Sequence, residues 1–374
     1  MNDKIQMLKN ERKEIINSYS NKSISDTPID NLVKDTKDLQ YVIVKEIIEE
    51  TNDTKSFILV PDNSKGTLKL EPFEAGQYVS IKMFVDDAYV TRAYSISSSP
   101  KDVQKGFYRI TIKRVSNGLI SNIMLDDIKV GAGFTISKPV GEFVYNDIRD
   151  ENNIIAIAGG SGITPFMSLA KSIIDGVFDC NLTVIYSVKT YNDIIFKKEI
   201  DYINKKSRKV KFVITLTREE KDGYLTGRIN KNMIEPYMKE FNTVFMCGPK
   251  ELYKTMNDIL KEFNIPKKSV HFENYFVYYK NQESNKFKLN VLIKDDVKKI
   301  TCNSNETLLV AMERAGIKAP SLCRVGTCGF CRSILIDGKI KMIGAIQPKA
   351  LSENDYIHPC VTYPESDIVL RLDI

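Results

Sequence analysis

The chain has few histidines, no long apolar run and no block of charge of one sign. Its only histidines are His271 and His358, and since no acid–base dyad is evident around them we expect both to be structural. Nowhere do 18 uncharged apolar residues follow one another, and no apolar run follows Met1-Asn-Asp-Lys. This predicts a protein without a membrane span or targeting segment, soluble and intracellular. The 54 basic and 48 acidic residues are interspersed, which indicates a solvated surface rather than a nucleic-acid footprint.

The seven cysteines do not form the framework of a disulfide-rich secreted protein. Cys323, Cys328 and Cys331 form a Cys-x4-Cys-x2-Cys run, and Cys360 follows after 28 residues. This is the plant-type spacing for a [2Fe–2S] cluster, with three ligands in one loop and a distant fourth. Glycines between the cysteines allow the loop to curl and to turn its amides towards the sulfurs. A labile thiolate cluster also indicates a reducing cytoplasm.

Two other readings of the cysteine run remain open. A zinc site in a purely structural domain also uses four cysteines, but typically as two short pairs, and Cys360 has no partner nearby. Cys328-Gly-Phe-Cys331 alone resembles a redox dithiol, which leaves Cys323 unexplained. Analysis of iron and acid-labile sulfide separates the cluster from zinc.

Hydrophobic periodicity predicts a multidomain chain. Residues 1–38 are polar with a loose helical pattern, and we expect an N-terminal helical extension there. Residues 39–147 show period two in six short segments and predict a small antiparallel β-barrel with one short helix near 118–125. Residues 148–280 alternate apolar runs with helical stretches near 163–175, 193–205, 230–240 and 250–263, which predicts a doubly wound parallel α/β unit. Residues 285–374 contain a strand pair, a helix near 306–315 and the cysteines, a small α+β domain.

Two segments of the predicted barrel carry groups suited to a flavin. In Arg92-Ala-Tyr-Ser-Ile-Ser-Ser98, strand alternation places Arg92, Tyr94 and Ser98 on one face. A flat flavin can stack on the Tyr94 ring while Arg92 pairs with a pyrophosphate, although the segment alone equally fits a surface strand. Gly118-Leu-Ile-Ser121 opens a helix, whose free N–H groups favour a phosphate, or it is a simple turn.

Two segments of the predicted α/β unit are suited to a dinucleotide. Gly159-Gly-Ser-Gly-Ile-Thr-Pro165 lies between a strand and a helix, where glycines allow close backbone approach to a pyrophosphate and Thr164 can cap the helix. Cys247-Gly-Pro249 ends a later strand at the same carboxyl edge. An ordinary tight turn and a buried core cysteine are the alternatives.

Taken in order, these four motifs resemble those of the ferredoxin–NADP reductase superfamily. With a plant-type ferredoxin domain after them, the chain is similar to the three-domain reductases of bacterial oxygenases and of the hybrid cluster protein. The resemblance implies an FAD-binding β-barrel (39–147), an NAD(P)-binding α/β domain (148–280) and a [2Fe–2S] ferredoxin domain of the β-grasp type (285–374).

The resemblance also implies a role for each matching residue. Ser95 would hydrogen-bond near the flavin N5, Cys247 would lie near the reactive carbon of the nicotinamide, and Glu273 would lie beside the flavin in a looser match that includes Phe276. The cofactors would further contact a set of residues on strands and glycine turns: Arg92, Tyr94, Ser98, Lys113, Gly118, Ser121, Gly159, Gly160, Gly162, Thr164, Gly248 and Pro249. The metal ligands would be Cys323, Cys328, Cys331 and Cys360.

The choice of nucleotide depends on charged residues that follow the second and third strands of the predicted α/β unit. Where the dinucleotide fingerprint has an acidic residue for a ribose hydroxyl, this chain has Lys189, and Arg218 follows the third strand. Both suit the 2′-phosphate of NADPH, but Asp222 nearby would repel it, so we favour NADH. FMN in place of FAD also stays open.

The function that these observations predict is electron transfer from NAD(P)H through FAD and [2Fe–2S] to a partner redox protein, an oxygenase component or a hybrid cluster protein. A flavin is needed because nicotinamide gives two electrons as hydride, whereas the cluster accepts one. The alternative is a non-catalytic, reductase-like regulatory subunit of a larger complex. Oxidation of pyridine nucleotide with an artificial acceptor separates the two.

Overall fold

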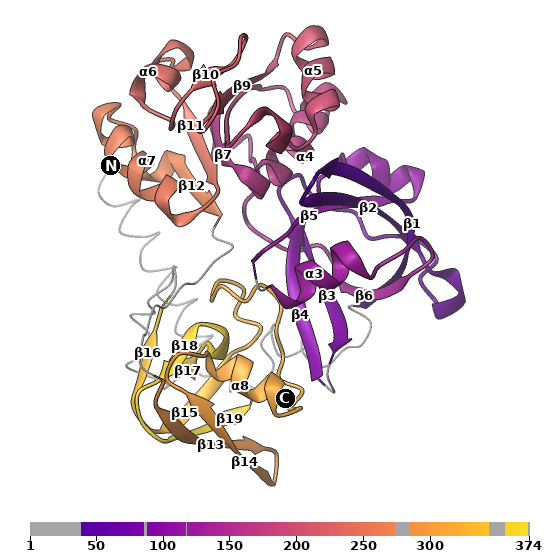
Figure 1. The fold of residues 1–374 in the computed structure, drawn as a ribbon, viewed down its shortest axis with the longest axis vertical. Coiled ribbons are helices and arrows are strands. Elements are labelled where there is room, and N and C mark those ends of the chain that lie inside the picture. The colour runs from indigo at the N-terminus through magenta and orange to yellow at the C-terminus, as the bar shows by residue number, and fades with distance from the viewer. Residues whose placement is uncertain (1–38, 86–87, 117, 274–283, 344–355, 373–374) are drawn as a thin grey trace, which may run out of the picture. The chain divides into compact units, whose positions relative to one another are not determined.

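The computed structural model describes residues 39–85, 88–116, 118–273, 284–343 and 356–372. The described residues form one compact unit with two six-stranded sheets, one five-stranded sheet and a strand pair. Figure 1 shows the chain passing through these sheets in sequence order, from indigo to yellow. The expected N-terminal helix in residues 1–38 and Phe276 lie outside the described residues.

The first sheet is antiparallel and has the strand order β4-β3-β6-β1-β2-β5. An isolated bridge between Ile96 and Ile110 joins the end of β4 to β5, so the sheet curls towards closure. Apolar residues at alternate positions, such as Val79 and Ile81, are fully buried in the core that the sheet encloses. The strands are β1 (Leu39–Thr51), β2 (Thr54–Pro61), β3 (Tyr78–Val85), β4 (Ala88–Ser95), β5 (Tyr108–Lys113) and β6 (Gly133–Ser137). The helix α3 (Leu119–Asp126) buries Ile120 and Met124 against this core, as predicted for this segment.

The second sheet is parallel, with the order β10-β9-β8-β7-β11-β12. Chain order reverses on either side of β7, which creates the switch point at which open α/β sheets bind ligands. The strands are β7 (Asn153–Gly159), β8 (Asn181–Val188), β9 (Val210–Leu216), β10 (Leu225–Thr226), β11 (Thr243–Cys247) and β12 (Val270–Glu273). The helices between them are α4 (Thr164–Ile174), α5 (Lys197–Lys206), α6 (Lys231–Ile234) and α7 (Lys250–Glu262).

Two helices of this unit differ from the prediction. The segment 230–240 forms only α6 followed by a 3-10 turn at Glu235–Tyr237, because Pro236 cannot donate the backbone hydrogen bond that would continue the helix. The segment predicted to begin at 193 starts α5 only at Lys197. Phe196, just before it, adopts a left-handed conformation with φ 60° and turns the chain there.

The third sheet has the order β14-β13-β19-β15-β17, and β16 and β18 form a separate antiparallel pair. The parallel pairing of β13 with β19 inside an otherwise antiparallel sheet, with one helix, is the predicted α+β arrangement. α8 (Leu308–Arg314) buries Leu308, Leu309 and Met312, and the Thr307 hydroxyl caps it by accepting from Val310 N. The strands are β13 (Lys286–Ile293), β14 (Asp296–Asn303), β15 (Ser333–Asp337), β16 (Ile340–Met342), β17 (Tyr356–Ile357), β18 (Thr362–Pro364) and β19 (Ile368–Leu372). In the described parts of the chain, no helix is long and apolar enough to cross a membrane.

Candidate functional site

The structure brings all four predicted metal-ligating cysteines together. Cys331 Sγ lies 3.2 Å from Cys360 Sγ, although the two residues are 29 apart in the chain. In the other pair, the backbone N–H groups of Val325 and Cys328 point at Cys323 Sγ, at 3.5 and 3.4 Å. Cys328 is exposed while the other three are buried. Two sulfur pairs fit a centre with two irons, each of which takes two thiolates.

Hydrogen bonding among the four cysteines divides them: it lowers the pKa of Cys323 and Cys331 and raises the pKa of Cys328 and Cys360. Hydrogen bonding to Cys328 and Cys360 lowers the pKa of Cys323, and the amides of Val325 and Cys328 add to this. Hydrogen bonding to Cys360, with a further contribution from His358, lowers the pKa of Cys331 to about 6. One thiolate is therefore favoured in each sulfur pair.

The loop that carries the cysteines depends on backbone conformations that few residues adopt. Gly326 has φ +77°, and a Cβ there would lie 2.9 Å from Val361 Cγ2, so only glycine fits. Arg324 also has a positive φ, of 61°. Its guanidinium donates to both carboxylate oxygens of the buried Glu313 in α8, at 2.5 and 2.9 Å. This two-bond pair fixes the strained residue against the helix.

The predicted flavin-binding strand is β4. Arg92 is partly buried, its Nη1 donates to the Thr91 carbonyl at 2.7 Å, and burial together with the nearby Arg324 charge lowers its pKa to about 10. Tyr94 packs against the barrel core, and burial raises its pKa. Ser95 is 4% exposed and lies directly opposite Tyr78 on β3. Arg92 is thus a partly buried cation close to a second cation, Arg324, and an anionic diphosphate would offset both charges.

Other predicted flavin contacts have partners within the barrel. The buried Ser98 hydroxyl accepts a hydrogen bond from Arg109 N at 3.1 Å. Lys113 Nζ pairs with Asp53 Oδ1 at 2.5 Å, so the carboxylate fixes the ammonium beside the strand end. The Ser121 hydroxyl accepts from the N–H of Val115 at 3.2 Å and closes the turn before α3.

Gly118 is the residue before α3 and is required there for steric reasons. A Cβ at Gly118 would lie 2.6 Å from Ser121 Oγ and 2.8 Å from Val115 Cβ. Only backbone groups can therefore bind a phosphate at this position, and the amides that begin α3 are suited to it.

The predicted dinucleotide loop packs tightly on the end of β11. A Cβ at Gly162 would lie 2.0 Å from the Cys247 carbonyl oxygen, and one at Gly248 would lie 3.1 Å from Gly159 N. A Cβ at Gly159 would lie 2.7 Å from Pro249 Cδ. Gly160, with φ +55°, has open space on its Cβ side. The glycines are thus needed to bring β7 and β11 together as well as to admit a ligand.

Thr164 does not cap α4, and that prediction is wrong. It is the first residue of α4, and its hydroxyl donates to the Ser161 carbonyl at 3.0 Å instead of accepting from a helix amide. The short 3-10 turn Gly160–Ile163 precedes the helix and supplies its first turn without a side-chain cap.

Two predicted catalytic residues lie at neighbouring strand ends. Cys247, the last residue of β11, pairs with Ala158 on β7 on one side and with Glu273 on β12 on the other. The Cys247 side chain is fully buried. Tyr253, which the sequence analysis missed, joins the two ends: its hydroxyl accepts from Gly248 N at 3.1 Å and donates to the Glu273 carbonyl. A tyrosine one helical turn after Cys-Gly-Pro leaves no signal by itself.

The two predicted basic residues also meet at this sheet edge. Arg218 N donates to the Lys189 carbonyl at 2.9 Å, which joins the ends of β8 and β9. Both side chains are exposed, as is Asp222. The carboxylate of Glu219 accepts from Tyr191 N at 2.7 Å in the same region, so the charge at this edge is mixed.

Three family models match the chain in the same order as its sheets. They are an oxidoreductase FAD-binding domain (residues 41–145), an oxidoreductase NAD-binding domain (156–258) and a 2Fe-2S iron-sulfur cluster binding domain (292–365). The chain belongs to the ferredoxin–NADP reductase superfamily, as a three-domain reductase. It is an oxidoreductase whose cofactors are FAD, a nicotinamide dinucleotide and a [2Fe–2S] cluster, so the predicted fold class and cofactors are confirmed.

Relatives and solved structures match this reductase over most of its length. The glycine betaine monooxygenase reductase subunit of Chromohalobacter salexigens is 26% identical, with 87% of this chain and 93% of the relative covered. The ferredoxin reductase component of the 3-ketosteroid-9-alpha-monooxygenase of Rhodococcus rhodochrous is 27% identical, with 87% and 94% covered. The structure of phthalate dioxygenase reductase superposes with a TM-score of 0.67 at 24% identity, covering 90% of this chain and 98% of that one.

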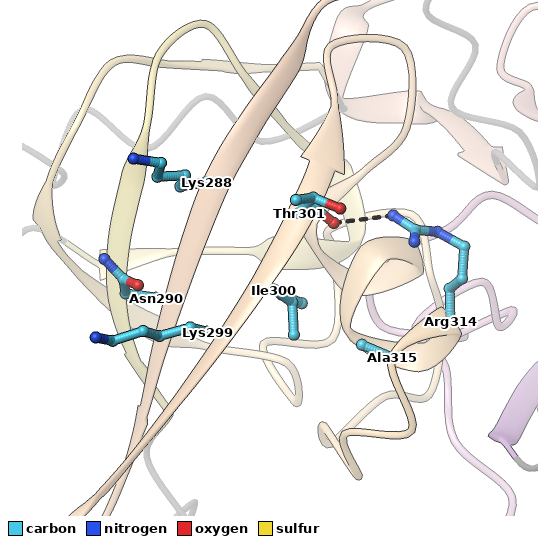
Figure 2. Close-up of a pocket in the computed structure, with 7 residues that line it drawn as sticks. All are labelled: Lys288, Asn290, Lys299, Ile300, Thr301, Arg314 and Ala315. Carbon is cyan, nitrogen blue, oxygen red and sulfur yellow. Dashed lines mark hydrogen bonds between the residues drawn. The ribbon is translucent and has the colours of Figure 1, made fainter.

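The reductase also has a groove of about 730 Å³ on its third sheet, lined by none of the predicted site residues. Figure 2 shows Lys288, Asn290 and Lys299 on the β13–β14 hairpin, and Arg314 reaching from α8 to the Thr301 carbonyl at 2.9 Å. Arg314 is also paired with Glu306 at 2.7 Å. The polar groups of Arg314 are therefore used to join α8 to β14.

Proposed function

We propose that the reductase oxidises NADH and delivers the electrons singly to a protein partner, the oxygenase component of a monooxygenase or dioxygenase system. The gathering of Cys323, Cys328, Cys331 and Cys360 into two sulfur pairs carries this proposal, because a one-electron centre suits a one-electron acceptor. Relatives that match 87% of the chain bear the names of monooxygenase reductase components, which supports an oxygenase as the partner.

The residues of β4 and the turn before α3 would hold the flavin. Arg92 would pair with its diphosphate, Tyr94 would lie against the ring system and Ser95 would hydrogen-bond near N5, while the first amides of α3 would add donors to phosphate. When bound, FAD accepts a hydride and releases single electrons, which no side chain of the protein does.

The edge formed by β7, β11 and β12 would orient the nucleotide. The glycines at 159, 160 and 162 would admit the diphosphate to the backbone, and Cys247 and Glu273 would flank the nicotinamide. Lys189 and Arg218 would lie beside the adenosine ribose. Because Asp222 and Glu219 share this region with them, we propose NADH as the preferred donor.

Anaerobically purified protein tests the proposal directly. We expect one FAD, two irons and two acid-labile sulfides per chain. We also expect two molecules of a one-electron acceptor to be reduced for each NADH that is oxidised. Zinc in place of iron would refute the cluster. Bound FAD without NADH oxidation would instead favour a regulatory, reductase-like subunit.

The partner is identified by comparing candidate acceptors under the same conditions. We expect an oxygenase component encoded near this reductase to be reduced in the presence of NADH, and a hybrid cluster protein to be reduced much more slowly. The opposite order would make the hybrid cluster protein the acceptor.

A cluster held by thiolates supports a cytoplasmic location, since oxidising compartments convert free thiols to disulfides.

A further inference from the structure

Two buried hydrogen bonds join the flavin-binding barrel to the loop that carries the cluster cysteines. Thr91 Oγ1 on β4 lies 2.6 Å from Ser321 Oγ, and Ser80 Oγ on β3 donates to the Leu322 carbonyl at 3.1 Å. Thr91 and Ser321 are each 8% exposed, and Ser80 is 2% exposed. Leu322 immediately precedes Cys323, so both contacts fall within two residues of a cluster ligand.

The two barrel residues lie on the same face as the predicted flavin contact Ser95. In the β3–β4 register, Tyr78 pairs with Ser95, Ser80 with Ala93 and Lys82 with Thr91. Residues directly opposite each other in an antiparallel pair share a face, and so do alternate residues along a strand. Ser80 is two residues along β3 from the Tyr78–Ser95 pair, a separation of about 7 Å.

Tyr78 supports the closeness of the cluster loop to this face. Its side chain is 6% exposed, and its ring borders the Cβ position of Gly141 at 3.1 Å. Burial is the main cause that raises the pKa of Tyr78, and the charges of Cys328 and Cys323 raise it further. The phenol therefore lies within electrostatic range of the sulfurs while its backbone pairs with Ser95.

We propose that Thr91 and Ser80 are positioning residues that seat the segment before Cys323 on the face of β3–β4 that also carries Ser95, and so set the flavin-to-cluster distance. This rests on the proposed function. NADH gives up a hydride, which is two electrons and one proton, and becomes NAD⁺. With FAD and the cluster bound, the two electrons would reach two one-electron acceptors in turn, and the proton would be released to water. The rate of each electron transfer falls steeply with distance. Transfer should therefore be faster when two buried hydrogen bonds hold the loop than when the loop is mobile.

The test uses the full-length holoenzyme with Thr91→Val and Ser80→Ala, singly and together. Both changes remove a hydroxyl with little change of shape and leave every cysteine in place. We expect hydrogen exchange at the amides of residues 321–325 to accelerate about 3- to 10-fold in each single variant, as for the loss of one buried hydrogen bond. Reduction of the cluster after mixing with NADH should slow, whereas reduction of the flavin should keep its wild-type rate.

A matched control is Thr226→Val on β10, an exposed threonine in a strand remote in sequence from both loops. It should change neither measurement. A second check is the double-mutant cycle of Thr91→Val with Ser321→Ala: because one bond joins the two hydroxyls, the double variant should exchange no faster than the more affected single variant.

The outcomes separate this proposal from the proposed function. Wild-type exchange and wild-type cluster reduction in the Thr91→Val/Ser80→Ala variant would overturn the positioning role. Faster exchange with unchanged cluster reduction would also overturn it, since the contact would then exist without setting the transfer. If NADH fails to reduce the cluster of the wild-type protein at all, the proposed function itself fails.

Discussion

Replacement of Arg109 on β5 should destabilise the flavin-binding barrel, because this residue is the centre of a buried ionic network. Its Nη2 pairs with Glu50 Oε1 at 2.6 Å and its Nη1 with Glu199 Oε1 at 2.5 Å. The side chains of Arg109 and Glu50 are each only 8% exposed. The guanidinium also lies 4.5 Å from the centre of the Phe196 ring.

The magnitude follows from what each carboxylate retains in Arg109→Leu. Glu199 keeps its ion pair with Lys171 at 2.6 Å, so it remains neutralised. Glu50 keeps only hydrogen bonds, from the Ser56 hydroxyl at 2.6 Å and from Phe196 N at 3.2 Å. An unpaired buried charge costs about 3–5 kcal/mol, and these two remaining donors place the loss near 3 kcal/mol. That is roughly a hundredfold in the unfolding equilibrium constant.

The assay is unfolding in denaturant, monitored by the fluorescence of the bound flavin, which reports on the barrel. Arg114→Leu is the matched control, because Arg114 pairs with Asp126 at 2.6 Å in an exposed site, where solvent screens the charges and the pair adds little to stability. Adding Glu50→Gln to Arg109→Leu should restore part of the lost stability by removing the unpaired charge. A loss below about 1 kcal/mol in Arg109→Leu, or no recovery in the double variant, would refute the reasoning.

Three further changes test other parts of the molecule. Cys328→Ser should lose the cluster and the reduction of one-electron protein acceptors while NADH still reduces the flavin; equal loss of both activities would contradict the order of transfer. Gly162→Ala should weaken NADH binding and destabilise the α/β unit, because the new methyl group meets the Cys247 carbonyl at 2.0 Å, and an unchanged KM and melting curve would argue against this packing. Burial lowers the pKa of His271 despite its pairing with Asp150, so the unfolded chain binds the proton more readily. The free energy of unfolding should therefore fall as the pH drops below about 6.5, and His271→Gln should flatten that fall in pH-dependent denaturation curves.

The fold was predictable to the extent that burial repeats with a regular period. Alternation in β1, where Val42 and Val44 are fully buried and Tyr41 is exposed, and the continuous buried run of β7 both identify the strand type. The short strands β15 to β18 were not predicted. β17 has only two residues, and its pairing with β15 comes from tertiary contacts that no local pattern encodes.

The candidate site was predictable where chemistry fixes a spacing and not where it depends on the fold. The cysteine run identifies the cluster because thiolate ligation constrains both residue type and separation. In contrast, Lys113 was expected beside the flavin, and nothing near it in sequence points to its ion pair with Asp53, 60 residues away. The same holds for Thr91 and Ser321, which are 230 residues apart and carry hydroxyls that leave no motif.

Adjacent residues of β4 have different roles because they lie on opposite faces of the strand. Val90 is buried in the barrel core and Tyr94 packs against it, whereas Thr91, between them on the opposite face, contacts the cluster loop. A substitution at 94 should thus change flavin retention and barrel stability, and one at 91 should change the cluster loop. Because a strand alternates faces at every residue, a one-residue insertion in β4 would exchange these roles and disrupt both at once. The packing of Tyr94 on one face, and the positions of Thr91 and Ser95 on the other, therefore fix the register of this strand more strictly than packing of the core alone.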